Sequence, residues 1–355
     1  YCHKEHKVAK KRFSYLCDLC SFFSWLMQEI RHMAKQFDIV VIGSGPGGYV
    51  AALKAAQMGA SVAVIEKHPF FGGTCLNWGC IPSKALLATG ELLHTFEQAK
   101  TLGISVDGNV SFDWSAVQKR KDKVIAKLRS GIKGLFTARQ VTTFHGRGRL
   151  NSAGSVTITS DDGKVEELRA GKVILAVGST PMRIPGWPVD HVRVCTSDES
   201  LHWKELPQKL IIVGGGVIGC EFACMMRSLG VEVNIIEMLP RLLPEMDAEL
   251  ATGLADVLQK RGVGLHLDTK VEHLDAHAHG VKATLRDGSA IEADHVLTAT
   301  GRRPATEDLG LETLGIQTQS GWILVNDMME TEAPGVYCIG DANRRCLLAH
   351  AASAQ

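Results

Sequence analysis

The chain has 355 residues, of which 45% are hydrophobic and 22% are charged; this composition is typical of folded globular proteins and excludes a largely disordered, collagen-like or disulfide-scaffold chain. The 39 basic and 38 acidic residues give a formal net charge of +1, which excludes the broad polycationic surface of a nucleic-acid-binding protein. The length predicts two or three domains.

Residues 1–32 differ from the rest of the chain in being basic and apolar. Six cationic and three acidic residues give this segment a charge of +3, and an apolar run covers residues 13–27. Asp18 interrupts the run, no signal-peptide cleavage site follows it, and the run is shorter than the roughly 20 residues of a membrane span. We therefore expect a leader or upstream translated segment before a natural start at Met33, and no membrane association. Candidate metal ligands here lack the second pair of a tetrahedral site, so no metal is expected: they are Cys2, His3, His6, Cys17 and Cys20.

A nucleotide-binding pattern follows the leader. Residues 37–42 form a short apolar run that predicts a buried parallel strand. A glycine turn over 43–48 (GSGPGG) leads into an apolar helix over 49–58, and a second strand ends on Glu66. In a dinucleotide site of this order, the glycines let the backbone approach a pyrophosphate at the helix N-terminus, and the acid accepts hydrogen bonds from a ribose.

Two cysteines stand close together in the segment 72–84 (GGTCLNWGCIPSK). The residues after Pro82 favour a helix, with Pro82 at its first position. A thiol just before a helix N-terminus has its thiolate stabilised by the helix dipole, and Lys84 adds positive charge. Cysteines this close in an intracellular protein are more often catalytic than structural. The spacing therefore favours a redox pair of Cys75 and Cys80, with unpaired thiols or metal ligands as alternatives.

The nucleotide-binding pattern then occurs a second time. A strand over 210–213 precedes a glycine turn over 214–219 (GGGVIG), a helix, and a strand that ends on Glu237. Two such units imply two dinucleotide cofactors, or one cofactor and one dinucleotide substrate, and so indicate electron transfer. The landmarks of the two units all lie 171 residues apart: Gly43 and Gly214, Gly45 and Gly216, Gly48 and Gly219, Gly59 and Gly230, and Glu66 and Glu237.

A further internal similarity is found between the segments that end the two halves of the sequence. Residues 172–178 (KVILAVG) resemble 295–301 (HVLTATG), and a proline follows each segment, at Pro181 and Pro304. Both segments read as a buried strand that runs into a turn. We expect each strand to close its half of the molecule.

The cysteine segment and the two dinucleotide patterns together resemble the pyridine nucleotide–disulfide oxidoreductases, and among them the dihydrolipoamide dehydrogenases. The likeness covers residues 35–355, and 331–341 (TEAPGVYCIGD) matches the family's second FAD fingerprint. It implies an α/β fold with two Rossmann-like dinucleotide-binding domains, the FAD-binding one interrupted by the NAD-binding one. The implied boundaries are 1–32 for the leader, 33–180 and 303–355 for the FAD-binding domain, and 181–302 for the NAD-binding domain.

The resemblance also implies the cofactor contacts. Glu66 would meet the adenosine ribose of FAD, and Asp341 a ribityl hydroxyl. Val177 stands where the family usually has threonine. The other implied FAD contacts are Gly43, Gly45, Gly48, Lys67, Gly73, Thr74, Lys84, Gly148, Val177, Gly178, Ser179, Leu347, Leu348, Ala349 and His350. The implied NAD contacts are Gly214, Gly216, Val217, Ile218, Gly219, Glu221, Glu237, Val271 and Gly301.

The resemblance implies flavin-dependent oxidation of protein-bound dihydrolipoamide with reduction of NAD⁺. Cys75 would form the mixed disulfide with the substrate, and Cys80, nearer the flavin, would form the charge-transfer thiolate. Glu221 matches the family's acid that pairs with Lys84, an ordinary helix-surface acid being the alternative. Glu237 favours NAD over NADP because a carboxylate repels a 2′-phosphate. The basic residue closest behind Glu237 is Arg241.

The family continues beyond the position matched by Gln355 with an interface domain, which dimerises and supplies a His–Glu base. None of the 14 histidines occupies that motif, and we expect His273, His277 and His279 to be solvated in a polar connection. We therefore expect a poorly active, incomplete copy of a homodimeric enzyme. The implied partner is the lipoyl domain of an acyltransferase or a glycine-cleavage carrier protein, in a bacterial cytoplasm or a mitochondrial matrix. Mercuric- or glutathione-reductase-like enzymes and a non-catalytic flavin-binding fragment are the alternatives.

Overall fold

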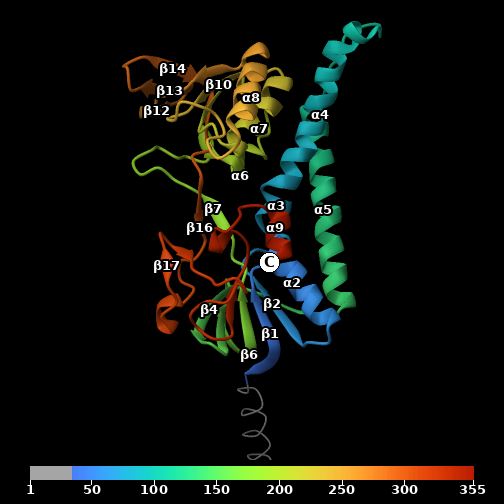
Figure 1. Cartoon of the computed structure of the whole chain (residues 1–355). Helices are drawn as coiled ribbons and strands as arrows, with labels where there is room; N and C mark the ends of the chain where they lie inside the picture. The colour runs from blue at the N-terminus through green and yellow to red at the C-terminus, as the bar shows by residue number, and fades with distance from the viewer. Residues whose placement is uncertain (1–33) are drawn as a thin grey trace, which may run out of the picture.

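The computed structural model describes residues 34–355, so the leader expected over 1–32 and its candidate metal ligands lie outside the described residues. Figure 1 shows two α/β bodies, one with β1, β2 and β6 and the other with β10, α7 and α8, and a pair of long helices, α4 and α5, along one side. The expected α/β fold with two Rossmann-like units is confirmed. Within residues 34–355, none of the helices combines the length and the apolar character that crossing a membrane requires.

The first body is built on a sheet of seven strands in the order β3-β2-β1-β6-β5-β4, with β19 paired to β6. Its centre is parallel, because β1 pairs with both β2 and β6 in the same direction. All five residues of β2 are buried, as expected for a strand covered on both faces. The strands are β1 (Lys35–Ile42), β2 (Val62–Glu66), β3 (Thr142–His145), β4 (Arg147–Ser152), β5 (Ser155–Thr159), β6 (Val165–Leu175) and β19 (Val336–Cys338).

The second body contains a parallel sheet of five strands in the order β11-β10-β9-β15-β8. The equivalence of the two sheets is direct, since β9 pairs with β10 and β15 as β1 pairs with β2 and β6. The strands are β8 (Val194–Thr196), β9 (Lys209–Val213), β10 (Glu232–Ile236), β11 (Gly264–His266) and β15 (His295–Thr298). The helices are α6 (Ser197–Ser200), α7 (Val217–Ser228) and α8 (Ala248–Lys260).

A three-stranded antiparallel sheet extends the second body. It consists of β12 (Val271–His277), β13 (Gly280–Leu285) and β14 (Ala290–Ala293). The polar connection expected around His273, His277 and His279 is therefore a β-hairpin, although the three histidines are exposed as expected. Buried residues of the hairpin, such as Leu274, belong to the same hydrophobic cluster as Ile211 and Val213 of the parallel sheet.

The two bodies are joined where the similar strands β6 and β15 end. The short strand β7 (Ser179–Pro181) follows β6, and β16 (Arg302–Pro304) follows β15. These two strands pair with each other in antiparallel fashion, with Arg302 opposite Pro181. The internal similarity in the sequence thus marks the crossing point between the bodies.

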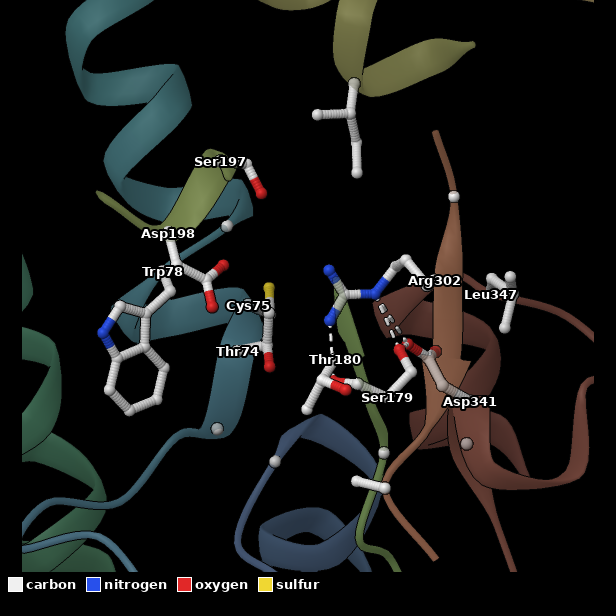
Figure 2. Close-up of a pocket in the computed structure, with 18 of the residues that line it drawn as sticks. Thr74, Cys75, Trp78, Ser179, Thr180, Ser197, Asp198, Arg302, Asp341 and Leu347 are labelled. Carbon is white, nitrogen blue, oxygen red and sulfur yellow. Dashed lines mark hydrogen bonds and ion pairs between the residues drawn. The ribbon is translucent and has the colours of Figure 1, made fainter. Parts of the chain in front are cut away.

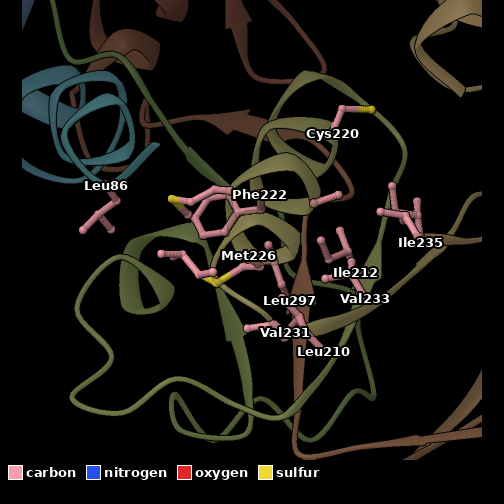
Figure 3. Packing of buried hydrophobic residues seen from close by; sticks show 14 of the residues in the cluster. Leu86, Leu210, Ile212, Cys220, Phe222, Met226, Val231, Val233, Ile235 and Leu297 are labelled. Carbon is pink, nitrogen blue, oxygen red and sulfur yellow. The ribbon is translucent and has the colours of Figure 1, made fainter. Parts of the chain in front are cut away.

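A helical pair ties the cysteine segment to the second body. Helix α4 (Cys80–Gln98) packs against α5 (Trp114–Ala138) and against α7, and the carboxylate of Asp113, the residue before α5, caps the first turn of that helix. Leu86 of α4 belongs to the same buried cluster as Phe222 of α7 (Figure 3). A side chain at Gly90 would meet Ser228 Cβ at 2.9 Å, so α4 and α7 lie in close contact.

The remaining elements cover the first body. Helix α9 (Ala349–Ala354) packs on α2 (Pro46–Gln57), and a side chain at Gly47 would reach the carbonyl oxygen of Ala352 at 3.1 Å. The end of the described chain thus lies beside the first glycine turn. The other short elements are α3 (Gly73–Asn77), η1 (Ala99–Leu102), η2 (Leu311–Leu314), β17 (Thr318–Gln319), β18 (Trp322–Ile323) and η3 (Gly340–Asn343).

Candidate active site

A cavity of about 1540 Å³ is lined by residues of both bodies, including both glycine turns and both cysteines. A pocket for a single drug-sized ligand measures roughly 300–1,000 Å³, so this cavity has room for more than one ligand. Both parallel sheets present the carboxyl ends of their strands to it, which is where α/β folds bind nucleotides.

The two acids at the strand ends are held in the same way. Glu66 is 5% exposed and Glu237 is 7% exposed, and each carboxylate accepts two backbone N–H bonds. These bonds leave lone pairs on both carboxylates that could accept further hydrogen bonds, such as those of a ribose. The donors are Ser44 and Gly215 to Oε2 (3.0 and 2.5 Å) and His68 and Leu239 to Oε1 (3.0 and 2.8 Å).

The turns themselves admit only glycine at key positions. Gly43 has φ +101°, and a Cβ there would lie 2.3 Å from the carbonyl oxygen of Ala176; Gly214 has φ +111° and would meet Ala299 at the same distance. A side chain at Gly73 would lie 2.5 Å from the Cα of Gly45. The resulting bare backbone at a helix N-terminus fits a pyrophosphate, so both turns fit a dinucleotide.

Two of the predicted contact glycines have a different role. Gly48 and Gly219 do not line the cavity. A Cβ at either position would lie 2.0 Å from the carbonyl oxygen of the first glycine of its own turn, Gly43 or Gly214. Their small size serves the close packing of helix on strand, and their contact with the cofactors stays a prediction.

The cysteines lie on two consecutive helices. Cys75 belongs to α3, and Cys80 is the first residue of α4. The prediction that Pro82 opens the helix is wrong by two residues, because Ser83 donates a 3.0 Å backbone hydrogen bond to Gly79 and closes a turn that already includes Cys80. Pro82 is tolerated at the third position because the N–H groups of a first turn have no partner within the helix.

The two thiols differ in acidity. The pKa of Cys80 is lowered to about 6, first because the thiol of Cys75 donates a hydrogen bond to it, and also because of the positive charge of Lys84; burial acts in the opposite direction. The pKa of Cys75 is raised, because its proton is held in the hydrogen bond to Cys80 and because it is buried. In the reduced form, Lys84 and the hydrogen bond from Cys75 therefore favour a negative charge on Cys80, the residue for which the resemblance implies a thiolate.

Lys84 reaches the second body. Its Nζ lies 2.6 Å from Oε1 of Glu221 on α7, the pair that the sequence leads us to expect. The side chains are 54% and 35% exposed, so the pair contributes at most about 1 kcal/mol to stability. The pair matters because it holds the positive charge of Lys84 beside Cys80.

Variants of this ion pair are expected to change the acidity of Cys80 in opposite directions. Lys84 lowers the pKa of the Cys80 thiol, whereas Glu221 raises it. We expect Lys84→Met to raise the midpoint of Cys80 alkylation by about 1 pH unit or more and Glu221→Gln to lower it. The measurement is the rate of iodoacetamide labelling of the reduced chain against pH. If both variants moved the alkylation midpoint of Cys80 by the same amount in the same direction, loss of the ion pair, and not the sign of each removed charge, would determine the acidity of the thiol.

Most other predicted contacts line the cavity, but His350 does not. His350 is exposed and lies outside the cavity lining. It follows Ala349 in α9, and Ala349 and Ala352 face the cavity; a helical step of about 100° turns His350 away from them. The predicted residues that line the cavity are Gly43, Gly45, Glu66, Lys67, Gly73, Thr74, Lys84, Gly148, Val177, Gly178, Ser179, Asp341, Leu347, Leu348 and Ala349 for FAD, and Gly214, Gly216, Val217, Ile218, Glu221, Glu237, Val271 and Gly301 for NAD.

Arg302 and Asp198 are among the charged residues of the cavity that sequence reasoning missed. Arg302 donates from Nε to the hydroxyl of Ser179 at 2.7 Å, and that hydroxyl donates to Asp341 at 2.5 Å (Figure 2). Its place directly after Gly301 in the repeated segment was an available signal. Asp198 also lines the cavity, but it stands within a Thr196–Glu199 capping box that makes the segment read as an ordinary helix start.

Comparisons with known proteins agree with this arrangement. The sequence pattern of the family described as pyridine nucleotide-disulphide oxidoreductase matches residues 37–355. The dihydrolipoyl dehydrogenase of Chlorobaculum tepidum is 41% identical over 333 residues, which are 93% of this chain and 71% of that protein.

Two solved structures show the same fold. LpdA from Mycobacterium tuberculosis has a TM-score of 0.84 at 30% identity, with 91% of this chain and 71% of that chain covered. The Cu(II) complex of the HOCl-induced flavoprotein disulfide reductase RclA from Escherichia coli has a TM-score of 0.80 at 27% identity, with 90% and 68% covered.

Proposed function

Because the chain belongs to the pyridine nucleotide-disulphide oxidoreductase family, we propose that it oxidises a protein-bound dihydrolipoyl group and reduces NAD⁺ through Cys75 and Cys80. The observation that carries the proposal is the placement of Cys75, Cys80 and Lys84 in one cavity that both glycine turns share. The similarity to dihydrolipoyl dehydrogenases supports dihydrolipoamide as the substrate.

The residues that would hold the cofactors fit them. The turn at Gly43 and the buried Glu66 would hold FAD, with Asp341 near its ribityl chain, while the turn at Gly214 and Glu237 would hold NAD. When bound, FAD would supply the two-electron chemistry between the dithiol and the nicotinamide. The chain contributes binding, orientation and control of the thiols.

The exchange at the cysteines follows from their different acidities. A substrate thiolate attacks the sulfur of Cys75, so that a substrate–Cys75 bond forms, the Cys75–Cys80 bond breaks and Cys80 departs as a thiolate. Cys80 is the better leaving group because its pKa is the lower one, and Lys84 stabilises the charge that it acquires. The second substrate thiol then attacks the substrate sulfur, which releases oxidised substrate and leaves Cys75 as a thiol.

A direct assay tests this proposal. The full chain, loaded with FAD, is expected to form NADH from NAD⁺ and dihydrolipoamide and to gain two titratable thiols when the oxidant is withheld. Oxidation of NADH or NADPH by glutathione disulfide or by mercuric ion tests the reductase alternatives. Turnover with either of these and none with dihydrolipoamide would contradict the proposed substrate.

A disulfide reductase is the second candidate, favoured by the structural similarity to RclA. Such an enzyme would oxidise a reduced nicotinamide nucleotide and reduce a disulfide substrate. The same two cysteines would then transfer electrons in the direction opposite to dihydrolipoyl oxidation. The ratio of the two initial rates, lipoamide reduction by NADH against dihydrolipoamide oxidation by NAD⁺, separates the candidates.

The second glycine turn is expected to prefer NADH to NADPH. Glu237 is buried with both oxygens fixed, so a 2′-phosphate would face an immobile negative charge. Arg241 donates from Nη2 to the carbonyl oxygen of Pro244 at 2.7 Å and does not line the cavity. The basic residue close behind Glu237 is thus engaged in its own loop.

Glu237→Ser tests this preference. We expect NADH to bind roughly 10- to 100-fold more weakly, which corresponds to the loss of charge-assisted hydrogen bonds worth about 1.5–3 kcal/mol, and the discrimination against NADPH to shrink. Calorimetric Kd values for both nucleotides provide the measurement. Glu66→Ser, the equivalent change in the first turn, is the matched control and should leave NADH binding unchanged. Equal affinity of the unmodified chain for NADPH and NADH would contradict the role of Glu237.

A further inference from the structure

Helix α5 concentrates the positive charge of the chain. Of its 25 residues, seven are cationic and one is acidic, which gives a formal charge of +6. Residues 34–355 contain 33 basic and 35 acidic residues in all, so the described residues outside α5 carry a net charge of −8. The helix runs along the outer side of the molecule (Figure 1). One exposed element is therefore strongly basic, whereas the rest of the described chain is acidic.

Three cations of α5 are used inside the molecule. The ammonium of Lys121 is 1% exposed and donates to the turn after α6, while Arg120 donates to α4 and Arg129 to α3. These bonds tie α5 to its neighbours, so the three charges have a structural role. The acceptors are the carbonyl oxygens of Leu201 at 2.9 Å and Ala85 at 2.7 Å and Oδ1 of Asn77 at 2.5 Å.

Three lysines on the outer face of α5 have no such role. Lys119, Lys123 and Lys127 are exposed, and none of the ion pairs formed within residues 34–355 includes them. Residues four apart lie on the same face of a helix, so the three ammonium groups form a single row over about 12 Å of helix. We call this row the basic strip.

The basic strip lines a groove of about 460 Å³, together with Ala116, Arg120 and Val124. Like charges four residues apart repel each other and destabilise a helix. The row is therefore unfavourable for the chain alone. Anionic groups placed in the groove would remove this repulsion, so the groove is suited to carboxylates.

The groove lies beside the helices that carry the two thiols. Arg120 of the groove donates to a carbonyl oxygen of α4 five residues after Cys80. Arg129, two residues beyond the strip, donates to a side chain of α3 two residues after Cys75. Helix α5 thus contacts both α3 and α4. A molecule bound along the basic strip would lie close to the cysteine pair.

The surrounding charge favours a protein with a local acidic surface as the occupant of the groove. A nucleic acid or an anionic membrane is an extended polyanion, and it would also meet the net charge of −8 on the other described residues. One acidic face of a folded domain could contact the strip alone. Complementary charges of this kind mainly accelerate association and select the partner.

We propose that the basic strip docks an acidic face of the protein that carries the dihydrolipoyl group, and so delivers that group to the Cys75–Cys80 disulfide. The inference rests on the proposed function, which requires such a carrier. Free dihydrolipoamide is uncharged and has no acidic face, so the strip should not affect its reaction. Because salt screens exposed charges, the advantage of the carrier should disappear at high ionic strength.

The test measures the second-order rate constant for reduction of the disulfide in the full chain, without NAD⁺. The reductant is free dihydrolipoamide or a lipoylated acyltransferase domain of net negative charge that has been reduced beforehand. Thiols of the chain are tagged with a maleimide and counted by mass spectrometry. The strip variant combines Lys119→Gln, Lys123→Gln and Lys127→Gln.

We expect the strip variant to be reduced by the domain roughly 10-fold or more slowly at about 0.02 M salt, within the range of electrostatic steering. Most of this difference should be lost at about 0.5 M salt. The rate constant with free dihydrolipoamide should be unchanged. The melting temperature should not fall, since glutamines relieve the repulsion between the lysines, and this excludes unfolding as the cause of the slower reaction.

A matched variant separates the strip from net charge. Lys164→Gln, Lys260→Gln and Lys282→Gln together remove the same charge from exposed lysines that line neither the groove nor the cavity. Their rate constant with the domain should be nearly unchanged. An equal loss in this variant would show that overall charge, and not the basic strip, attracts the carrier, which would overturn the proposal.

Other results would also overturn it. These are an unchanged rate constant of the strip variant with the domain, a loss that persists at high salt, or an equal loss with free dihydrolipoamide. Tighter binding of the unmodified chain to double-stranded DNA or to phosphatidylserine vesicles than to the domain would identify a different occupant. If free dihydrolipoamide left the disulfide of the unmodified chain intact, the proposed function itself would be contradicted instead.

Discussion

Replacing Cys80 by serine is expected to abolish dihydrolipoamide oxidation, with a fall of roughly 10⁴-fold or more, the scale seen when the covalent chemistry of an active site is removed. The variant has no disulfide to exchange, and it also loses the thiol with the lowered pKa. Serine has nearly the same size, so the start of α4 and the ion pair of Lys84 should be unaffected.

Cys75→Ser is expected to be equally inactive but spectroscopically different. A serine hydroxyl at position 75 can still donate a hydrogen bond to Cys80, as the Cys75 thiol does, so the Cys80 thiolate should persist with a pKa near 6. In Cys80→Ser the remaining Cys75 thiol is half-buried, and this partial burial still raises its pKa although the hydrogen bond to Cys80, the largest cause of the rise, is lost. A thiolate that titrates at neutral pH should therefore be absent.

Ultraviolet thiolate absorbance against pH, measured on both variants in the reduced state, provides the comparison. Cys75→Ala completes the set: it removes the donor and should raise the pKa of Cys80. If Cys80→Ser retained the neutral-pH thiolate and Cys75→Ser lost it, the assignment of the charge to Cys80 would be wrong.

Alanine at Gly43 or at Gly214 is expected to remove one nucleotide site and spare the other. Each substitution forces a left-handed φ on alanine and places its Cβ 2.3 Å from a carbonyl oxygen of the neighbouring strand end. Together, strain and overpacking should cost at least about 3 kcal/mol and distort the turn. Gly43→Ala should lose bound FAD and keep NADH binding, and Gly214→Ala should do the reverse. Flavin absorbance per chain and calorimetric NADH titration are the two measurements.

The chain offers matched controls for both substitutions. Gly59 and Gly230 end the two equivalent helices with φ of +92° and +89°, and a Cβ at either position would meet nothing within 4 Å. Alanine there imposes the left-handed strain of roughly 1–2 kcal/mol without a steric clash. Both controls should therefore retain FAD and NADH. Loss of flavin from Gly59→Ala as complete as from Gly43→Ala would mean that general instability, and not the turn, governs cofactor binding.

The constant spacing of 171 residues between the two nucleotide-binding units predicted more of the site than either glycine motif would have predicted alone. It located both strand-end acids, and the structure extends the equivalence to their hydrogen bonds, since the donors Ser44 and Gly215 are also 171 residues apart. Such features are local: a strand, a turn and a helix that follow one another determine them. The internal similarity of the strands that end at Gly178 and Gly301 was equally informative.

Features that depend on long-range packing were not predictable in this way. The exposed direction of His350 depends on how α9 lies against α2, and the helix start at Cys80 depends on a bond that Gly79 accepts. The hairpin around His273 is stabilised by burial of its other face against the parallel sheet. Asp198 is notable only because tertiary structure buries its Oδ1 without a partner. None of these properties leaves a periodic pattern in the sequence.

The first sheet is interrupted by the entire second body, because β19 returns to pair with β6 only after β8 to β15 have been formed. The second body is continuous in sequence, and all the strands of its own sheet lie between β8 and β15. During synthesis the second sheet can therefore be complete while the first still lacks its returning strand and the helix α9 beside Gly47. Pairings between strands so far apart in sequence form late. The first glycine turn, at residues 43–48, is thus translated early, but the elements that surround it, β19 and α9, are translated last.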